Sequence, residues 1–242
     1  MATGGNSDGI DWLSYPHEVL AVVLSVRRGQ LCVLLWRRAR APFRGRWSLP
    51  GGGVEPDERL RDAITRHLAT KVDVRELAHR EQLATHSAVG RDPRARVLAT
   101  AYLGLVPSDV DPALPSDTAW QPVDDLPPLA FDHHFFIDAA VERLRAKLSY
   151  TNIGFALAPH EFAISELRDI VSAALGYDVG ATNLTRVLSR RHMIESTRRT
   201  ASSGATGGRP ATLYRFATRH LTVTDPFAVL KPPRHGADTT EH

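Results

Sequence analysis

The segment GGVEPDERLRDAITRHLATKVDV, residues 52–74, decides the fold of the first half of the chain. Its first part is a turn rich in glycine and proline. From Asp57 to about Lys71 the apolar residues then recur every three or four positions, as Leu60, Ala63, Ile64 and Leu68. This spacing predicts an amphipathic helix that begins directly after the turn.

Short apolar runs surround this helix. HEVLAVVLSV (17–26) and LCVLLWRR (31–38) precede it as two strands of a hairpin, and LAHREQLATHS (77–87) and RVLATAYLGLV (96–106) follow it. A second helical pattern, FDHHFFIDAAVERLRAKL, covers 131–148. The order of strands, helix, strands, helix predicts a mixed α/β domain that ends near Leu148.

The second half of the chain has a different pattern. EFAISELRDIVSAAL (161–175) predicts a helix, GYDVGA (176–181) a turn and TNLTRVLSRR (182–191) a second helix, and residues 192–217 predict a hairpin with a long Gly/Ser tip. Two helices followed by a hairpin are typical of a winged helix-turn-helix. We therefore expect a disordered tail (1–15), a first domain (16–148), a linker (149–158), a winged helix-turn-helix domain (159–226) and a flexible tail (227–242).

Composition limits the function classes. The 242 residues are 43% hydrophobic and 24% charged, as in ordinary globular proteins. The single cysteine, Cys32, excludes an internal disulfide, and no leader-like or membrane-spanning stretch is evident, so we expect a cytoplasmic protein without a membrane partner. Net charge is only +3, yet residues 181–220 hold eight arginines against Glu195 alone, a local charge of +7.

This basic region predicts binding to double-stranded DNA. The second helix mixes side chains that read base edges with cations that neutralise phosphates, and further arginines flank the hairpin tip. For any one of these arginines a solvated surface is the alternative. The predicted DNA-binding residues are Thr182, Asn183, Thr185, Arg186, Arg190, Arg198, Arg199 and Arg209.

In the first domain, Gly52, Glu58 and Arg66 have the spacing of the Nudix box, G-x5-E-x7-R-E-U-x-E-E-x-G-U, with LPGGGVEP (49–56) before it. The chain resembles the Nudix fold over residues 16–148, which implies an α/β/α sandwich with a mixed sheet. In that family, glutamates on one helix face hold divalent metal that activates water against a nucleoside diphosphate.

The metal-binding half of the box is absent. His67, Thr70 and Lys71 stand where the family has glutamates, and Asp73 replaces the glycine. A lysine ammonium repels a dication, so we predict no catalytic residues and no metal. We expect Glu58 and Arg66 to form an ion pair; residual hydrolysis through a relocated metal is the alternative.

A nucleotide can still bind such a pocket. Arginine forks and backbone N–H groups at a helix start suit a diphosphate, and an indole suits a base. The stretch EQLATHSAVGRDPRARVLATAYL also resembles the Nudix subgroup that handles ADP-ribose, although LATH replaces an aromatic LYTF. Its RDPR turn is alternatively a self-paired loop or a dimer contact. The predicted ligand-binding residues are Arg44, Arg46, Trp47, Gly52, Gly53, Glu58, Gln82, Arg91 and Arg94.

Together with the Asn183 helix, three further stretches, GRPATLYRF (208–216), LAFDHHFF (129–136) and YTNIGFAL (150–157), resemble the Nudix-related transcriptional regulators of NAD metabolism. The resemblance implies a homodimer that binds a palindromic operator and senses ADP-ribose or a related nucleotide, with no cofactor required. We expect any ligand-driven motion at the connector, 149–159. The alternatives are an active Nudix hydrolase of ADP-ribose with an appended nucleic-acid-binding module, and a constitutive DNA-binding protein whose first domain only dimerises.

Overall fold

The computed structural model describes residues 15–201 and 211–226. The two tails and the tip of the hairpin, which includes Arg209, lie outside the described residues. The first domain is built on one mixed sheet in the order β3-β2-β1-β6-β5, with β4 paired to β1 and β7 to β2. The strands are β1 (His17–Arg27), β2 (Gln30–Arg37), β3 (Trp47–Ser48), β4 (Gly51–Gly53), β5 (His79–His86), β6 (Leu98–Leu105) and β7 (Thr118–Pro122).

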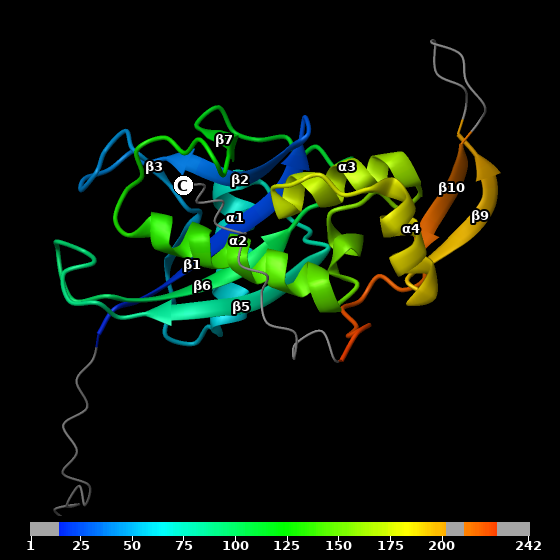
Figure 1. The fold of residues 1–242 in the computed structure, drawn as a ribbon. Helices are drawn as coiled ribbons and strands as arrows, with labels where there is room; N and C mark the ends of the chain where they lie inside the picture. Colours follow the sequence, from blue (N-terminus) through cyan, green and yellow to red (C-terminus); the bar gives the residue numbers. More distant parts are fainter. Residues whose placement is uncertain (1–14, 202–210, 227–242) are drawn as a thin grey trace, which may run out of the picture.

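Strand β1 carries the core of this domain on both of its faces. Val19, Ala21 and Val23 pack against α1 (Leu60–Val72), whereas the alternate residues of the same strand pack against α2 (His133–Tyr150). A strand buried on both sides reads as a continuous apolar run, as this one does. The two helices cover opposite faces of the sheet (Figure 1), so the expected α/β/α sandwich with a mixed sheet is confirmed.

Helix α1 begins at Leu60, three residues later than the apolar spacing predicted. Residues 55–58 form a turn instead, in which the N–H of Glu58 donates to the carbonyl of Glu55 at 3.1 Å. The helix ends at Asp73, whose φ of 52° is left-handed. Aspartate tolerates this conformation better than most residues, so it can replace a glycine here.

The second half folds as expected for a winged helix-turn-helix. It contains α3 (Ile164–Leu175), α4 (Ala181–Arg190) and a three-stranded antiparallel sheet of β8 (Phe162–Ala163), β10 (Thr212–Phe216) and β9 (Ile194–Thr200). The two-residue strand β8 was not predicted from the sequence. Helix α4 and the β9–β10 hairpin lie together at the end of the molecule distant from the β3 edge (Figure 1).

The expected linker is buried. Its first residues are the last turn of α2, and it continues into the 3-10 helix η1 (Ile153–Ala156). Every residue of 151–159 is buried, and the Asn152 amide donates to the carbonyl of His220 at 2.9 Å. One apolar core runs from β1 through this connector to Phe216 of the winged helix. In the described part of the chain, no helix is long and apolar enough to cross a membrane.

Candidate functional site

A cavity of about 360 Å³ opens beside the box residues, between β4, the last turn of α1 and the start of α2. Basic side chains and aromatic rings make up half of the residues that line it. The lining residues are Glu18, Leu20, Trp36, Arg38, Arg40, Ser48, Leu49, Gly51, Gly52, Gly53, Lys71, Arg94, Phe131 and His133. Of the residues predicted to bind ligand, Gly52, Gly53 and Arg94 are at this cavity.

The box residues are engaged with each other and with β4. The Glu58 carboxylate accepts hydrogen bonds from Arg66 Nε at 2.8 Å and Nη2 at 2.6 Å, so the expected ion pair is present. This pair lowers the pKa of Glu58 to about 2. His67 Nε2 donates to the carbonyl of Gly53 at 3.0 Å, and the Thr70 hydroxyl donates to the carbonyl of Arg66 at 2.8 Å.

Gly52 allows α1 to approach the sheet this closely. A Cβ at this position would lie 2.6 Å from Cε1 of His67, well inside contact distance. A glycine is therefore needed where β4 passes under the helix. The same approach brings Lys71 over β4, where its ammonium donates to the carbonyl of Gly51.

Two cationic side chains line the cavity, and each lies against an aromatic ring. Lys71 Nζ lies 4.8 Å from the centroid of the Trp36 ring, and the Arg38 guanidinium lies 4.6 Å from that of Phe131. Arg38 Nε also donates to the carbonyl of Pro42 at 3.0 Å. Burial and the nearby Arg38 lower the pKa of Lys71, and burial and the nearby Arg94 lower that of Arg38. Positive charge therefore gathers here with too little negative charge to balance it.

Arg91 is not among the residues that line the cavity, and its side chain forms ion pairs within the fold. Its side chain is 1% exposed and binds two carboxylates, Asp132 through Nε at 2.9 Å and Nη2 at 2.8 Å, and Glu18 through Nη1 at 2.7 Å. The partners' hydrogen bonds and charges outweigh burial and hold its pKa above the usual value. Arg94 pairs with Asp92 at 2.5 Å, within the RDPR turn, whereas Arg91 pairs outside the turn, so only half of the turn is self-paired.

The remaining predicted ligand residues lie outside the cavity wall. Arg44 and Arg46 are exposed and donate to the carbonyls of Ala39 and Leu129. Trp47 is half-buried in β3 against the core, with the guanidinium of Arg37 4.9 Å from its ring. Gln82 is exposed on β5.

The predicted ligand residues did not include most of the wall, and Arg38, Arg40, Phe131 and His133 are four of the wall residues that were missed. His133 is 2% exposed, and its Nδ1 accepts a hydrogen bond from the backbone N–H of Leu49 at 2.9 Å. Burial lowers the pKa of His133 to about 3, so the ring is neutral. The "RRAR" run at 37–40 was a visible signal for Arg38 and Arg40, whereas nothing in the local pattern indicated Phe131.

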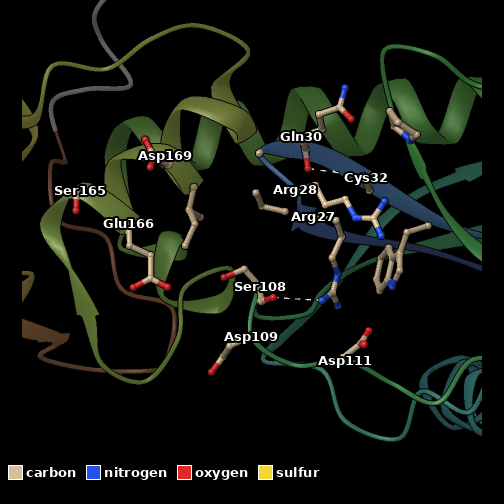
Figure 2. Close-up of a pocket in the computed structure, with 15 residues that line it drawn as sticks. Arg27, Arg28, Gln30, Cys32, Ser108, Asp109, Asp111, Ser165, Glu166 and Asp169 are labelled. Carbon is tan, nitrogen blue, oxygen red and sulfur yellow. Dashed lines mark hydrogen bonds between the residues drawn. The ribbon is translucent and has the colours of Figure 1, made fainter. Parts of the chain in front are cut away.

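A larger cavity of about 940 Å³ lies away from the box, between the β1–β2 hairpin and α3 (Figure 2). Arg27 crosses it and donates to the carbonyl of Ser108 at 3.2 Å. Glu166 of α3 and Asp109 of the first domain both line it, and burial with the nearby Asp109 raises the pKa of Glu166. Both domains contribute walls, so this cavity is an interdomain groove.

Helix α4 presents a polar surface to solvent. Leu184 and Leu188 are buried against α3 and β9, whereas Thr182, Asn183, Arg186 and Arg190 are exposed and Thr185 is partly so. Arg186 Nη2 donates to the Asn183 side-chain oxygen at 2.7 Å. Arg186 is thus oriented by its own helix and needs no contact with the rest of the protein.

The wing continues this surface. Arg198 and Arg199 are exposed on β9, and Arg199 Nη1 pairs with Glu161 at 2.9 Å. The described residues predicted to bind DNA therefore lie on α4 and β9, the two elements that a winged helix presents to DNA.

Comparison with known proteins agrees with this architecture. Residues 15–144 match the NUDIX domain, and residues 154–216 match the NrtR DNA-binding winged helix domain. The ADPR responsive transcriptional repressor NtrR of Acinetobacter baylyi is 34% identical over 93% of this chain and 92% of its own length.

Solved structures show the same arrangement. Shewanella oneidensis NrtR in complex with a 27mer DNA is 34% identical, with a TM-score of 0.72 over 82% of this chain and 92% of that one. The NUDIX domain of the same protein, solved with ADP ribose, is 36% identical, with a TM-score of 0.50 over 57% of this chain and 94% of that domain. The chain belongs to the NrtR family, in which a Nudix domain is joined to a C-terminal winged-helix DNA-binding domain.

Proposed function

We propose that this protein is a transcriptional repressor that binds a palindromic operator as a homodimer. Its Nudix domain senses ADP-ribose or a related nucleotide and does not hydrolyse it. The relatives support this assignment, since one is described as an ADPR responsive transcriptional repressor and another was solved with DNA.

One observation carries the sensing role. The cavity at the box is walled by Arg38, Arg40 and Lys71, whereas the carboxylate of the box, Glu58, is held by Arg66. Cations and aromatic rings without free carboxylates suit a nucleoside diphosphate and do not suit Mg²⁺. Such a site binds the ligand that a hydrolase would cleave.

The regulated genes are those of NAD metabolism, as the resemblance in GRPATLYRF and YTNIGFAL implies. A dimer places two recognition helices in successive major grooves, which requires half-sites roughly one helical turn apart. ADP-ribose acts by binding the free and DNA-bound forms with different affinity.

A mobility-shift titration at fixed salt tests the regulatory role. With operator DNA held by the full chain, added ADP-ribose is expected to lower the bound fraction, and adenosine at the same concentration is not. If ADP-ribose, NAD and related nucleotides all leave the bound fraction unchanged, the protein is a constitutive DNA-binding protein.

A turnover assay tests the absence of hydrolysis. With excess MgCl₂ and ADP-ribose, we expect binding but no release of AMP. Sustained AMP release that disappears in Glu58→Gln would instead identify an active hydrolase with an appended DNA-binding module.

A further inference from the structure

The Nudix fold implies a divalent metal between the box and the diphosphate, and the residues of this chain do not fit one. Glu18 is the one carboxylate among the residues that line the cavity, and it accepts a hydrogen bond from Arg91 at 2.7 Å. Glu58 is paired with Arg66. Within residues 15–201 and 211–226, no three His, Cys, Asp or Glu side chains gather as a metal site.

Lys71 supplies a positive charge at the same place. It is in the last turn of α1, at a position where the box has a glutamate that would bind metal. Its ammonium donates to the carbonyl of Gly51, in the strand where the glycine-rich turn passes under the helix. A lysine has three N–H donors, so this bond leaves two for a ligand.

The surroundings hold this ammonium in place and leave its charge unsatisfied. The Trp36 ring lies 4.8 Å from Nζ, and the side chain is half-buried. Among the charged groups that act on it most strongly, Arg38, Arg66 and Arg40 are positive and Glu18 is negative. An anion that enters the cavity removes this imbalance, and a cation increases it.

We propose that the Lys71 ammonium takes the place of the metal and binds the diphosphate of the effector, so that this protein binds its effector without a divalent cation. The proposal rests on the proposed sensing function. Arg38, which lines the same cavity, contacts the same diphosphate. His67, Thr70 and Lys71 thus remove the metal needed for hydrolysis, and Lys71 replaces the electrostatic role of that metal in binding.

Calorimetry of ADP-ribose binding to the full-length protein tests this. In excess EDTA and in excess MgCl₂ the wild-type dissociation constant is expected to agree within about twofold. Lys71→Met loses a charge-assisted hydrogen bond and is expected to bind about tenfold more weakly in both buffers. Lys71→Glu is expected to lose binding in EDTA and to recover part of it with Mg²⁺.

Arg61→Met, which removes an exposed cation from the first turn of the same helix, serves as the matched control and is expected to bind like the wild type. Operator binding without effector shows that each variant is folded. Wild-type binding that requires Mg²⁺, or unchanged binding by Lys71→Met, overturns the proposal. Absence of ADP-ribose binding in both buffers overturns the sensing function, and this inference with it.

Discussion

The two cation-rich regions of the molecule differ in how far their cationic side chains are buried and in what these side chains bind. At the box cavity, Lys71 and Arg38 are partly buried, supported by aromatic rings and bound to backbone carbonyls. On α4, Arg186 and Arg190 are exposed, and among residues 15–201 and 211–226 the Arg186 side chain hydrogen-bonds only within its own helix. The first arrangement suits a small ligand of defined shape, and the second suits a long polyanion whose charge draws the protein to it.

The largest expected difference between the two regions is in how strongly their binding depends on salt concentration. The proposed homodimer would present Arg186, Arg190, Arg198 and Arg199 twice, and each phosphate contact releases counterions. Raising salt from about 50 to 200 mM should weaken operator binding by about a thousandfold or more. ADP-ribose binding should change only a few-fold, because partly buried charges are less screened. Calorimetry and mobility shifts at matched salt measure both, and equal slopes would contradict the comparison.

Arg91→Ala is expected to lower the free energy of unfolding of the protein and not only to weaken ligand binding. It leaves Glu18 and Asp132 without their shared partner, and breaking such a buried pair costs about 3 to 5 kcal/mol. Urea unfolding measures this loss. Arg75→Ala, which removes an exposed pair with Asp73, is the control and should cost less than about 1 kcal/mol. Equal effects would mean that the Arg91 network is not structural.

Arg186→Ala is expected to affect DNA binding without affecting the fold. Loss of a base contact costs about 1 to 3 kcal/mol, so operator affinity should fall at least tenfold, while ADP-ribose affinity and urea unfolding stay unchanged. Arg186→Lys keeps the charge, so it should retain non-specific binding and lose discrimination among operator sequences. Unchanged operator affinity in Arg186→Ala would remove this residue from the recognition role.

Acid should weaken the fold through His133, at the base of the cavity. Its pKa is about 3 in the fold and about 6.5 in an unfolded chain. Between these values the unfolded chain binds a proton that the folded protein does not, so stability falls as the pH falls below about 6.5. The slope is about 1.4 kcal/mol per pH unit. Urea unfolding at about pH 6 and pH 5 should show a smaller difference in His133→Gln; an equal difference would assign the slope to other groups.

Local pattern was enough for the four α-helices, the longer strands and contacts between residues near each other in sequence, but it did not predict the short strands β3, β4, β7 and β8. The spacing from Leu60 to Leu68 predicted α1, and Glu58 and Arg66, eight residues apart, form the predicted pair. It was also enough for α4, whose buried face is defined by Leu184 and Leu188 within one helix.

Pattern did not reveal contacts whose partner lies far along the chain. Arg91 resembled a ligand-binding arginine, and its buried role depends on Glu18 and Asp132, 73 and 41 residues away. Phe131 and Arg38 meet only because the sheet and the start of α2 bring them together. A sequence shows that a residue is cationic. Only the fold shows whether a carboxylate of the protein already pairs with that cation.

The buried connector also affects whether the winged-helix domain can be joined to a different sensor domain. Gly154 of η1 packs against β10, where a Cβ would be in van der Waals contact with the ring of Phe216, at 3.4 Å. A winged helix cut out at Pro159 would leave this packing surface behind, along with Asn152 and its bonds to the segment after β10. The DNA-binding half is therefore not an interchangeable cassette. Gene recombination that joins it to another sensor has to carry residues 151–159 and a matching surface on the new partner.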